Sequence, residues 1–367
     1  MKFAVPGGRL SDALKVVASA TEAKSTIPIL ANVLIVADSD GLHVTGTDLD
    51  VRLQTKVADA DVQQSGRTTV ALSSLRTLVS KLPKDAMVTA TADGATIQVA
   101  SGKSRYKLNT LPADDFPDME GIEDKGVVKL DADGFTHLFD RIAFAISTEE
   151  TRYYLNGIYV HERAGKLYGV ATDGHKLALA GWTLDGTWPQ GVIVPTKAIK
   201  AATAAFPKGC EIATNGQRIS FRAGDVVLMS KLIDGTFPDY MRFIPQASDD
   251  NTVIRVDRET FGSAIARLRS IMSERGSAVK MEVDDSIRGS VRGPEGDEGS
   301  EEIQGEIVRL GKEETTVGLN SRYLDLVLGS ITTELVDLEY ANAGAPVRLT
   351  PVGPGAEYLA IVMPMRV

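Results

Sequence analysis

Residues 5–17 read VPGGRLSDALKVV, and the pattern in this stretch recurs twice more along the chain. An apolar residue of a short strand is followed, five positions later, by the apolar residue that opens an amphipathic helix. These pairs are Val5 and Leu10, Leu130 and Phe135, and Val256 and Phe261. Chance convergence is the alternative, but the steps of 125 and 126 residues favour three copies of one unit. The period is far longer than that of solenoid repeats, so each copy is expected to be its own α+β domain.

A second helix is predicted within each copy, after another short apolar strand. These helices are expected at about 73–82, 196–206 and 321–330, and the first helices at 9–20, 135–147 and 259–272. All six carry apolar residues at helical spacing. Between them, strands with period-two alternation are separated by turn dipeptides such as Asp40-Gly41 and Asn215-Gly216. Each copy is therefore predicted to hold two half-units, each a helix followed by strands.

Domain boundaries are expected in two polar, linker-like segments, at 118–126 and 246–251. A Phe-Pro-Asp motif stands near the end of a copy twice, at 116–118 and at 237–239, where proline ends a strand. The predicted domains are residues 1–122, 123–249 and 250–367.

Composition indicates an ordinary globular protein of more than one domain. The 367 residues are 43% hydrophobic and 24% charged, and Cys210 is the single cysteine, so no internal disulfide forms. The first residues lack the apolar region of a signal peptide, and no apolar run approaches membrane-spanning length. A cytoplasmic location is expected.

Positive charge is concentrated on the six expected helices. They hold ten basic and four acidic residues, a net charge of +6, which leaves −15 for the rest because the total is −9. The basic residues are Arg9, Lys15, Arg76, Lys81, Arg141, Lys197, Lys200, Arg267, Arg269 and Arg322. If these helices share a face, that face suits contact with backbone phosphates without reading of bases. Ordinary solvated helix surfaces are the alternative.

No catalytic, metal or cofactor constellation is apparent. The four histidines lack the i, i+4 pairing of a helical zinc site, and no glycine-rich phosphate loop matches. Residues 172–175 read TDGH, which is compatible with an acid–base or metal site or with a turn that ends a strand. The first copy has TDLD at 47–50, with no histidine, which favours the turn.

Three further segments indicate binding surfaces. Residues 152–157 read RYYLNG and predict an exposed loop that runs into a strand. Its tyrosines and arginine suit single-strand or phosphate contact, and the alternative is one packed tyrosine with one at the rim. Residues 290–302 read SVRGPEGDEGSEE and predict a flexible acidic loop, or a partner for the basic strand around Lys103, Arg105 and Lys107. Residues 359–367 read LAIVMPMRV, a final strand or an apolar, methionine-rich patch that binds peptides.

Taken together, six motifs resemble the bacterial DNA polymerase III beta subunits, the beta sliding clamps. The motifs are MKF at 1–3, TIPILAN at 26–32, RYYLNG at 152–157, TDGH at 172–175, FPDY at 237–240 and MPMR at 363–366. The resemblance covers the whole chain. It implies the DNA clamp fold, with three similar domains that each pack two helices on antiparallel sheets. It also implies a head-to-tail homodimer that forms a pseudo-sixfold ring.

The resemblance implies a non-catalytic processivity factor without cofactors. Such a ring encircles double-stranded DNA and slides without sequence specificity. It tethers the DNA polymerase III alpha subunit, the clamp loader delta subunit and other proteins that carry a clamp-binding motif. An acidic adaptor unrelated to DNA, or a hydrolase that uses Asp173 and His175, are the competing functions. A housekeeping clamp and a duplicate, inhibitor-resistant copy are not distinguished.

The resemblance also implies three sets of site residues. The partner-peptide groove would be formed by Leu155, Thr172, Gly174, His175, Lys176, Leu177, Pro238, Arg242, Phe243, Tyr323, Val347, Ile361, Met363, Pro364, Met365 and Arg366. DNA would be contacted by Lys24, Glu149, Arg152, Tyr153 and Tyr154, to which the helix charges add Arg76, Lys81, Lys197 and Lys200. The dimer interface would place Lys103, Arg105 and Tyr106 against Ile271, Met272, Glu298, Glu301 and Glu302.

The chain departs from the family pattern in the predicted groove. Lys176 stands where the family often has arginine, and Phe243 replaces a smaller aliphatic residue. Gly344 and Pro346 replace residues that help to wall the groove. These departures are expected to change peptide preference rather than to abolish binding.

Overall fold

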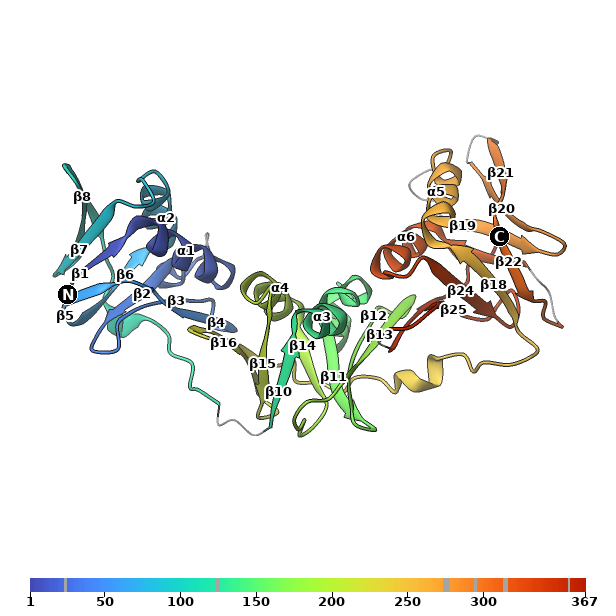
Figure 1. The fold of residues 1–367 in the computed structure, drawn as a ribbon, viewed down its shortest axis with the longest axis horizontal. Coiled ribbons are helices and arrows are strands. Elements are labelled where there is room, and N and C mark those ends of the chain that lie inside the picture. The colour runs from blue at the N-terminus through green and yellow to red at the C-terminus, as the bar shows by residue number, and fades with distance from the viewer. Residues whose placement is uncertain (23–24, 123–125, 273–277, 294–295, 313–315, 356) are drawn as a thin grey trace. The chain divides into compact units, whose positions relative to one another are not determined.

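The protein is described from a computed structural model that covers every residue except 23–24, 123–125, 273–277, 294–295, 313–315 and 356. The chain forms two compact units (Figure 1). Unit 1 comprises Met1–Phe135, Asp185–Gln190 and Lys197–Leu232, and unit 2 comprises Thr136–Leu184, Gly191–Thr196 and Ile233–Val367. The middle sequence copy therefore contributes to both units.

Each copy repeats the order strand, helix, three strands twice. The first copy contains β1 (Lys2–Pro6), α1 (Gly7–Val17), β2 (Asn32–Ala37), β3 (Leu42–Thr47), β4 (Val51–Lys56), β5 (Asp61–Gln64), β6 (Gly66–Ala71), α2 (Leu72–Ser80), β7 (Met87–Asp93), β8 (Thr96–Ser101) and β9 (Ser104–Asn109). The second contains β10 (Val127–Asp131), α3 (Ala132–Phe135), β11 (Gly157–Arg163), β12 (Lys166–Thr172), β13 (Lys176–Thr183), β14 (Val192–Pro195), α4 (Thr196–Ala205), β15 (Gly209–Thr214), β16 (Arg218–Ala223) and β17 (Val226–Lys231).

The third copy contains β18 (Thr252–Asp257), α5 (Arg258–Arg269), β19 (Ala278–Val283), β20 (Ile287–Arg292), β21 (Glu298–Glu302), β22 (Gly305–Arg309), β23 (Thr316–Asn320), α6 (Ser321–Ser330), β24 (Leu335–Tyr340), β25 (Val347–Pro351) and β26 (Glu357–Val362). The strands β5 and β22 are additions to the common order. The predicted repeat of two half-units per copy is confirmed.

In unit 1, one antiparallel sheet joins the first copy to the second. Its order is β10-β15-β16-β17-β4-β3-β2-β6, and β17 pairs with β4 from Val226 opposite Thr55 to Ser230 opposite Val51. A second sheet has the order β5-β1-β7-β8-β9 and ends at β9. The helices α1 and α2 pack on each other and bury Leu10, Leu14 and Val79 in the core between them and these strands.

In unit 2, an equivalent sheet joins the second copy to the third. Its order is β14-β11-β12-β13-β26-β25-β24-β18-β22, and β13 pairs with β26 from Lys176 opposite Val362 to Gly181 opposite Glu357. A four-stranded sheet, β21-β20-β19-β23, ends at β21. The helix α5 packs on α6 and buries Phe261, Ile265 and Leu268 at the predicted spacing.

The predicted continuous helix at 135–147 is wrong. The chain forms the short α3, then a π-helical turn at Thr136–Asp140 and a 3-10 turn at Ala143–Ala145. The Arg141 N–H donates to the carbonyl of Thr136 at 3.0 Å, the long-range bond of a π turn. The carbonyl of Leu138 lies so close to Gly169 of β12 that a Cβ there would be 2.5 Å away. This close approach accompanies the burial of three consecutive side chains, those of residues 137–139.

The remaining helices match their predictions apart from the ends. The predicted helix at 9–20 ends at Val17 and continues as a 3-10 turn at Ala18–Ala20, and α2 ends at Ser80, so Lys81 follows it. Within the predicted loop at 290–302, residues 290–292 and 298–302 are strand, because β20 and β21 pair from Arg288 opposite Glu302 to Arg292 opposite Glu298. The acidic segment is thus an edge strand.

Candidate functional site

A candidate site is an apolar cavity of about 310 Å³ in unit 2. The residues that line it come from β12, β13, β26 and two turns of 3-10 helix. They are Arg152, Tyr154, Leu155, Thr172, Gly174, Lys176, Leu177, Pro238, Tyr240, Phe243, Ile361 and Met363. Nine of the sixteen residues predicted for the peptide groove are among them.

The turn between β12 and β13 forms one wall of this cavity. The Thr172 hydroxyl donates to the carbonyl of Lys176 at 2.8 Å, and the Asp173 carboxylate accepts from the backbone N–H groups of His175 and Lys176 at 2.8 and 2.9 Å. Gly174 has a φ of +90°, a conformation that favours glycine. The TDGH motif is therefore a turn that ends a strand, as the sequence comparison with residues 47–50 favours.

The same turn occurs at two other places in the chain. The Thr47 hydroxyl donates to the carbonyl of Val51 at 2.9 Å, and the Thr214 hydroxyl donates to the carbonyl of Arg218 at 2.7 Å. The residue with positive φ is Leu49 in the first turn and Gly216 in the second. Because the same turn recurs, backbone geometry accounts for the TDGH motif. A catalytic role for the Asp173 carboxylate is not needed to explain it.

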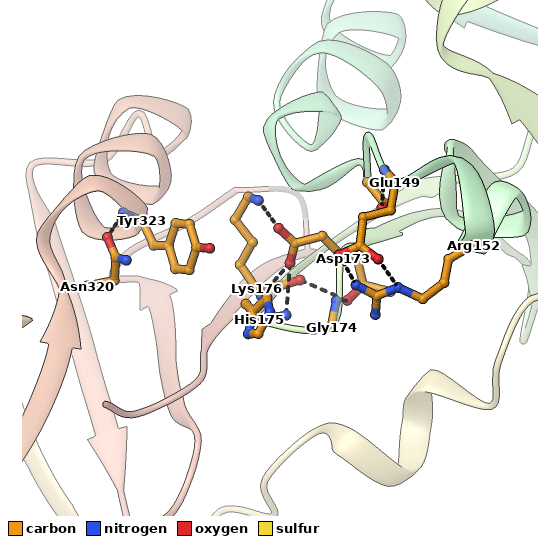
Figure 2. Close-up of polar contacts among 10 residues, drawn as sticks. Glu149, Arg152, Asp173, Gly174, His175, Lys176, Asn320 and Tyr323 are labelled. Atoms are coloured by element: carbon orange, nitrogen blue, oxygen red, sulfur yellow. Dashed lines mark hydrogen bonds and ion pairs between the residues drawn. The ribbon is translucent and has the colours of Figure 1, made fainter. Parts of the chain in front are cut away.

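Gly174 lies against the side chain of Arg152, and the absence of a Cβ leaves room for the guanidinium. A Cβ at Gly174 would lie 2.9 Å from Nη1 of Arg152. The guanidinium is held by Glu149, with Nε donating to Oε2 at 2.7 Å (Figure 2). The same bond from Arg152 lowers the pKa of the Glu149 carboxyl. Arg152 was predicted to contact DNA, but its guanidinium is committed to Glu149 and lines the cavity.

Lys176 is buried beneath the turn and paired with Asp173. Figure 2 shows the two side chains pointing toward each other, with Tyr323 of α6 beside the lysine. The lysine Nζ lies 4.8 Å from the centre of the Tyr323 ring, within cation–π range. Burial alone would raise the pKa of Asp173, but hydrogen bonds from Lys176 and two backbone N–H groups lower it. Asn320 caps α6 by accepting from the N–H of Tyr323.

A segment that we call the strap, residues 237–243, forms the opposite wall. Its 3-10 helix runs from Tyr240 to Phe243, and the Phe243 side chain is 60% exposed. Arg242 pairs with Asp239 at 2.8 Å. Three cations around the cavity, Arg152, Lys176 and Arg242, are each paired with a carboxylate three residues earlier in the chain, which neutralises their charge. The cavity has an apolar lining and little net charge.

The end of β26 completes the cavity. Leu177 and Ile361 are paired across β13 and β26, and the Met363 N–H donates to the carbonyl of His175 at 2.9 Å. Beyond it, Met365 forms a bridge to Gly318 of β23. Pro364, Met365 and Arg366 line a neighbouring cavity with Gly344, while Val347 is fully buried in β25.

Sequence reasoning misses three residues of the cavity. For two of them, Arg152 and Tyr154, the RYYLNG motif predicts DNA contact from a loop that enters a strand. Instead, Glu150–Leu155 form two 3-10 turns separated by a kink at Arg152, and β11 begins at Gly157. Tyr153 is 53% exposed, whereas Tyr154 turns inward against the apolar cluster around Leu155. Tyr240 also lines the cavity, and its only signal was its place in the FPDY motif.

The predicted DNA-contacting residues fall into different environments. Arg76, Lys81 and Lys200 are exposed, and within the described part of the chain no carboxylate pairs with them. Lys197 is paired with the buried carboxylate of Asp48 and lies 3.7 Å from Glu22. Lys24 lies outside the described residues. Much of the positive helix charge counted from the sequence is therefore offset by carboxylates of the same chain.

The predicted interface residues lie on or beside the two unpaired edge strands. On β9, Arg105 is exposed and Tyr106 is 40% exposed, and Lys103 precedes them in the turn. Next to β21, Ile271 is 36% exposed and Met272 is half-buried. Glu301 accepts two hydrogen bonds from Arg267, at 2.9 and 2.6 Å, and Glu298 pairs with Arg292 at 2.9 Å.

Comparison with known proteins decides the family. Profiles of the N-terminal, central and C-terminal domains of the DNA polymerase III beta subunit match residues 1–120, 129–239 and 241–366. The chain belongs to this family. The beta sliding clamps of Caulobacter vibrioides and Pseudomonas putida are 37% and 33% identical, with 100% of each chain covered.

Solved structures of beta subunits share the fold along the whole chain. The Caulobacter crescentus polymerase III beta subunit has a TM-score of 0.92 at 36% identity, with both chains fully covered. A sliding clamp from Bartonella birtlesii bound to griselimycin has a TM-score of 0.91 at 33% identity, again with full coverage. The predicted DNA clamp fold, with helices on antiparallel sheets, is confirmed.

Membership in the beta sliding clamp family sets the function. The protein is a DNA sliding clamp, a non-catalytic processivity factor of the DNA polymerase III holoenzyme. The alternative of a hydrolase built on Asp173 and His175 is wrong, since both residues belong to the recurring turn. None of the helices in the described ranges has the length and apolar character that a membrane span needs.

Proposed function

We propose that two copies of the chain close head to tail into a ring, with β9 of one copy paired to β21 of the other. The support is topological. Two sheets join successive copies. In each, the third strand after the first helix of one copy pairs with the third strand after the second helix of the next copy. These pairs are β4 with β17 and β13 with β26. The strands left in these positions are β21 and β9, each of which pairs on one side only in the described part of the chain. A heterologous contact of this kind closes when the rotation permits, and closure leaves no such edge exposed.

Charge on the two edge strands supports this pairing. Leu108 packs on the core of its sheet, so alternation places Arg105 and Lys107 on the outer face of β9. On β21, Glu301 reaches the helix side to pair with Arg267, which places Glu298 and Glu302 on the outer face. Joining the two edges would bring two basic and two acidic side chains together on one face of a continuous sheet.

On the face of β9 and β21 that is turned toward the helices, the exposed side chains are apolar, and their sizes on the two strands are complementary. Tyr106 is on the core face of β9, opposite Val99 of β8. On the other edge, Gly299 leaves room for Ile271, since a Cβ at Gly299 would lie 2.7 Å from Cδ1 of Ile271. An exposed aromatic and an exposed aliphatic residue would thus be covered, together with Met272, while Lys103 and Glu301 lie at the rim. Burial of apolar surface stabilises such an interface by about 25 cal/mol per Å².

We further propose that duplex DNA passes through the ring and is held by weak phosphate contacts. The best candidates are the exposed cations Arg76, Lys81 and Lys200, with which no carboxylate among the described residues pairs. Tyr153 is added as an exposed aromatic residue. Lys24, Glu149, Arg152, Tyr154 and Lys197 complete the proposed set. Intrachain pairing of Lys197 and Arg152 lowers their share of the attraction, which suits sliding because no phosphate is gripped tightly.

The apolar cavity is proposed as the groove that takes peptides of the polymerase, the clamp loader and other partners. Its lining is mostly apolar and its cations are neutralised, so it suits an uncharged segment with aliphatic and aromatic side chains. A relative with the same fold has been solved with griselimycin bound, which supports use of the same groove here. His175, Arg242, Tyr323, Val347, Pro364, Met365 and Arg366 would support or extend it.

The domain boundaries near residues 122 and 249 and a cytoplasmic location remain part of this proposal. The decisive experiment is retention on DNA. After loading, the protein is expected to stay on a nicked circular duplex and to leave when the circle is cut open, since a closed ring slides off ends. Equal retention on circular and linear DNA at the same salt concentration would contradict encirclement.

A further inference from the structure

One face of β11 carries the strap. Tyr159, His161 and Arg163 alternate along this strand and therefore point to the same side. Tyr159 stacks on Phe237 with ring centres 5.0 Å apart and planes at 7°. Nε2 of His161 lies 2.8 Å from the hydroxyl of Tyr240.

The third contact is made by Arg163. Its Nη1 donates to the sulfur of Met241 at 3.0 Å. Three successive residues of one strand face thus hold three residues of the strap, whose other side walls the groove through Pro238, Tyr240 and Phe243.

We propose that His161 is a positioning residue for the peptide groove, which it controls by holding the hydroxyl of Tyr240. This inference rests on the proposed role of the cavity as the partner groove. His161 does not line the cavity, so it acts only through Tyr240. The strap is a short 3-10 turn with few backbone bonds of its own, so its position depends on such side-chain anchors.

The hydrogen-bond pattern defines the proton arrangement at His161. Its Nδ1 lies 3.3 Å from the carbonyl of Glu162, which can only accept, so Nδ1 carries the proton. Nε2 then accepts from the Tyr240 hydroxyl. Burial raises the pKa of Tyr240 to about 12, which keeps this hydroxyl protonated and able to donate.

Protonation of His161 removes the acceptor that Tyr240 uses. With hydrogen on Nε2, the imidazolium donates and the Tyr240 hydroxyl must turn its own hydrogen away and accept, so the direction of the hydrogen bond reverses. Burial lowers the pKa of His161, whose ring lies between Tyr159 and Tyr168 at 5.0 and 5.6 Å. The arrangement in which Tyr240 donates to His161 therefore persists at neutral pH and reverses only as the pH falls below the ordinary titration range of histidine.

The charged groups beside His161 act in opposite directions on its pKa: burial lowers it most, Glu162 raises it and Arg163 lowers it, so the pKa of His161 stays lowered. Glu162 and Arg163 flank it on β11, and the neighbouring Tyr168 of β12 donates to Glu357, which also pairs with Lys166. Glu357 is thus already satisfied. In the described part of the chain, no carboxylate accepts a hydrogen bond from the His161 ring.

The experiment is a calorimetric titration of the intact protein with griselimycin between pH 5 and pH 8. Loss of one hydrogen bond that orders the wall is expected to weaken binding about three- to tenfold. The wild-type chain should show part of this loss as the pH falls, because the reversed bond places a charge within the buried ring stack. His161→Phe and Tyr240→Phe should bind weakly at every pH, with a flattened profile, because both lose the bond and keep the ring.

Control variants separate the effect of His161 from a general loss of folding and from the titration of other histidines. His43→Phe removes a half-buried histidine from β3 in unit 1 and should leave the pH profile unchanged. Repeating the pair of variants with His175→Gln removes the exposed histidine beside the groove. His161→Gln should restore part of the affinity at all pH values, since its amide oxygen can accept and does not titrate.

The outcomes distinguish this inference from the groove assignment itself. A His161→Phe chain with wild-type affinity and an unchanged pH profile would overturn the role of His161 and leave the groove assignment standing. Griselimycin binding that survives Leu177→Glu, a change in the floor of the cavity, would instead overturn the groove assignment.

Discussion

The ammonium group of Lys176 lies 4.8 Å from the centre of the Tyr323 ring, so a strand of the second copy contacts a helix of the third (Figure 2). The same lysine pairs with Asp173, and its side chain is only 8% exposed. A single buried charge thus supports the turn beneath the groove and the start of α6.

Replacing Lys176 with methionine should strip Asp173 of its partner in a largely buried position. We expect a loss of about 3 kcal/mol, because an uncompensated buried charge is costly. Lys176→Arg keeps the charge and should cost less. Denaturant unfolding measures both, and adding Asp173→Asn to the methionine variant should recover part of the loss. Equal stability of the methionine and arginine variants would contradict a stabilising pair.

Leu49 adopts a φ of +81° at the position that glycine occupies in the other two turns. A branched side chain is strained there, so Leu49→Gly should stabilise the protein by about 1 kcal/mol. Its side chain is 41% exposed, so little packing is lost. The matched change is Gly174→Ala, which should destabilise, since the new Cβ would meet Arg152. Thermal unfolding of both variants checks the opposite signs.

His137 makes unfolding sensitive to acid. Its Nε2 lies 2.9 Å from the carbonyl of Glu357, and burial lowers its pKa. The folded state therefore takes up this proton at a lower pH than the unfolded state. Its stabilisation is complete above about pH 6.5 and is lost below it, by up to about 1.4 kcal/mol per pH unit. His137→Gln should flatten this slope in denaturant unfolding at pH 5.5 to 8.

His161 titrates in the same direction, so its share must be separated. A His161→Phe chain should keep the slope that belongs to His137, and the double variant should lose nearly all of it. An acid slope that is the same in wild type and the double variant would assign the effect to other groups.

Charge reversal on the outer face of β9 should break the ring. Arg105→Glu with Lys107→Glu places acids opposite Glu298 and Glu302, and dissociation should become at least about tenfold more favourable. Light scattering at low salt would report monomers. A chain that also carries Glu298→Lys and Glu302→Lys should form dimers again. Dimers in the first variant would argue against the proposed pairing of β9 with β21.

Deleting residues 363–367 should abolish griselimycin binding while dimers persist, since Met363 lines the groove and the edge strands are untouched. Val367→Ala is the matched control, because this side chain does not line the cavity and is not part of the proposed groove. Unchanged affinity after the deletion, measured by calorimetry, would refute the assignment of the groove. Weaker binding by Phe243→Val would separately show that the exposed ring at the rim contributes to recognition.

Local patterns in the sequence were sufficient to predict the repeat and most of its elements. The spacing of Leu10, Leu14 and Val17 predicts α1, and period-two alternation predicts β2 and β9, because burial of one face depends on the intrinsic period of each element. The turn at 172–175 could also be predicted by comparison with residues 47–50. The π turn at Thr136–Asp140 could not, because it accompanies contact with Gly169, a residue distant in sequence.

The sequence by itself determined the threefold unit, the charge on its helices and, through its motifs, its family. Tertiary structure alone decided which strands join successive copies, which edges stay unpaired and which side chains meet at the groove. Arg152 illustrates the reason. Its sequence context favours phosphate contact. In the structure it lies in the cavity wall instead, because it pairs with Glu149 and because Gly174 leaves space for its side chain. Backbone pairing and charge neutralisation act between residues far apart in the chain, so no local pattern records them.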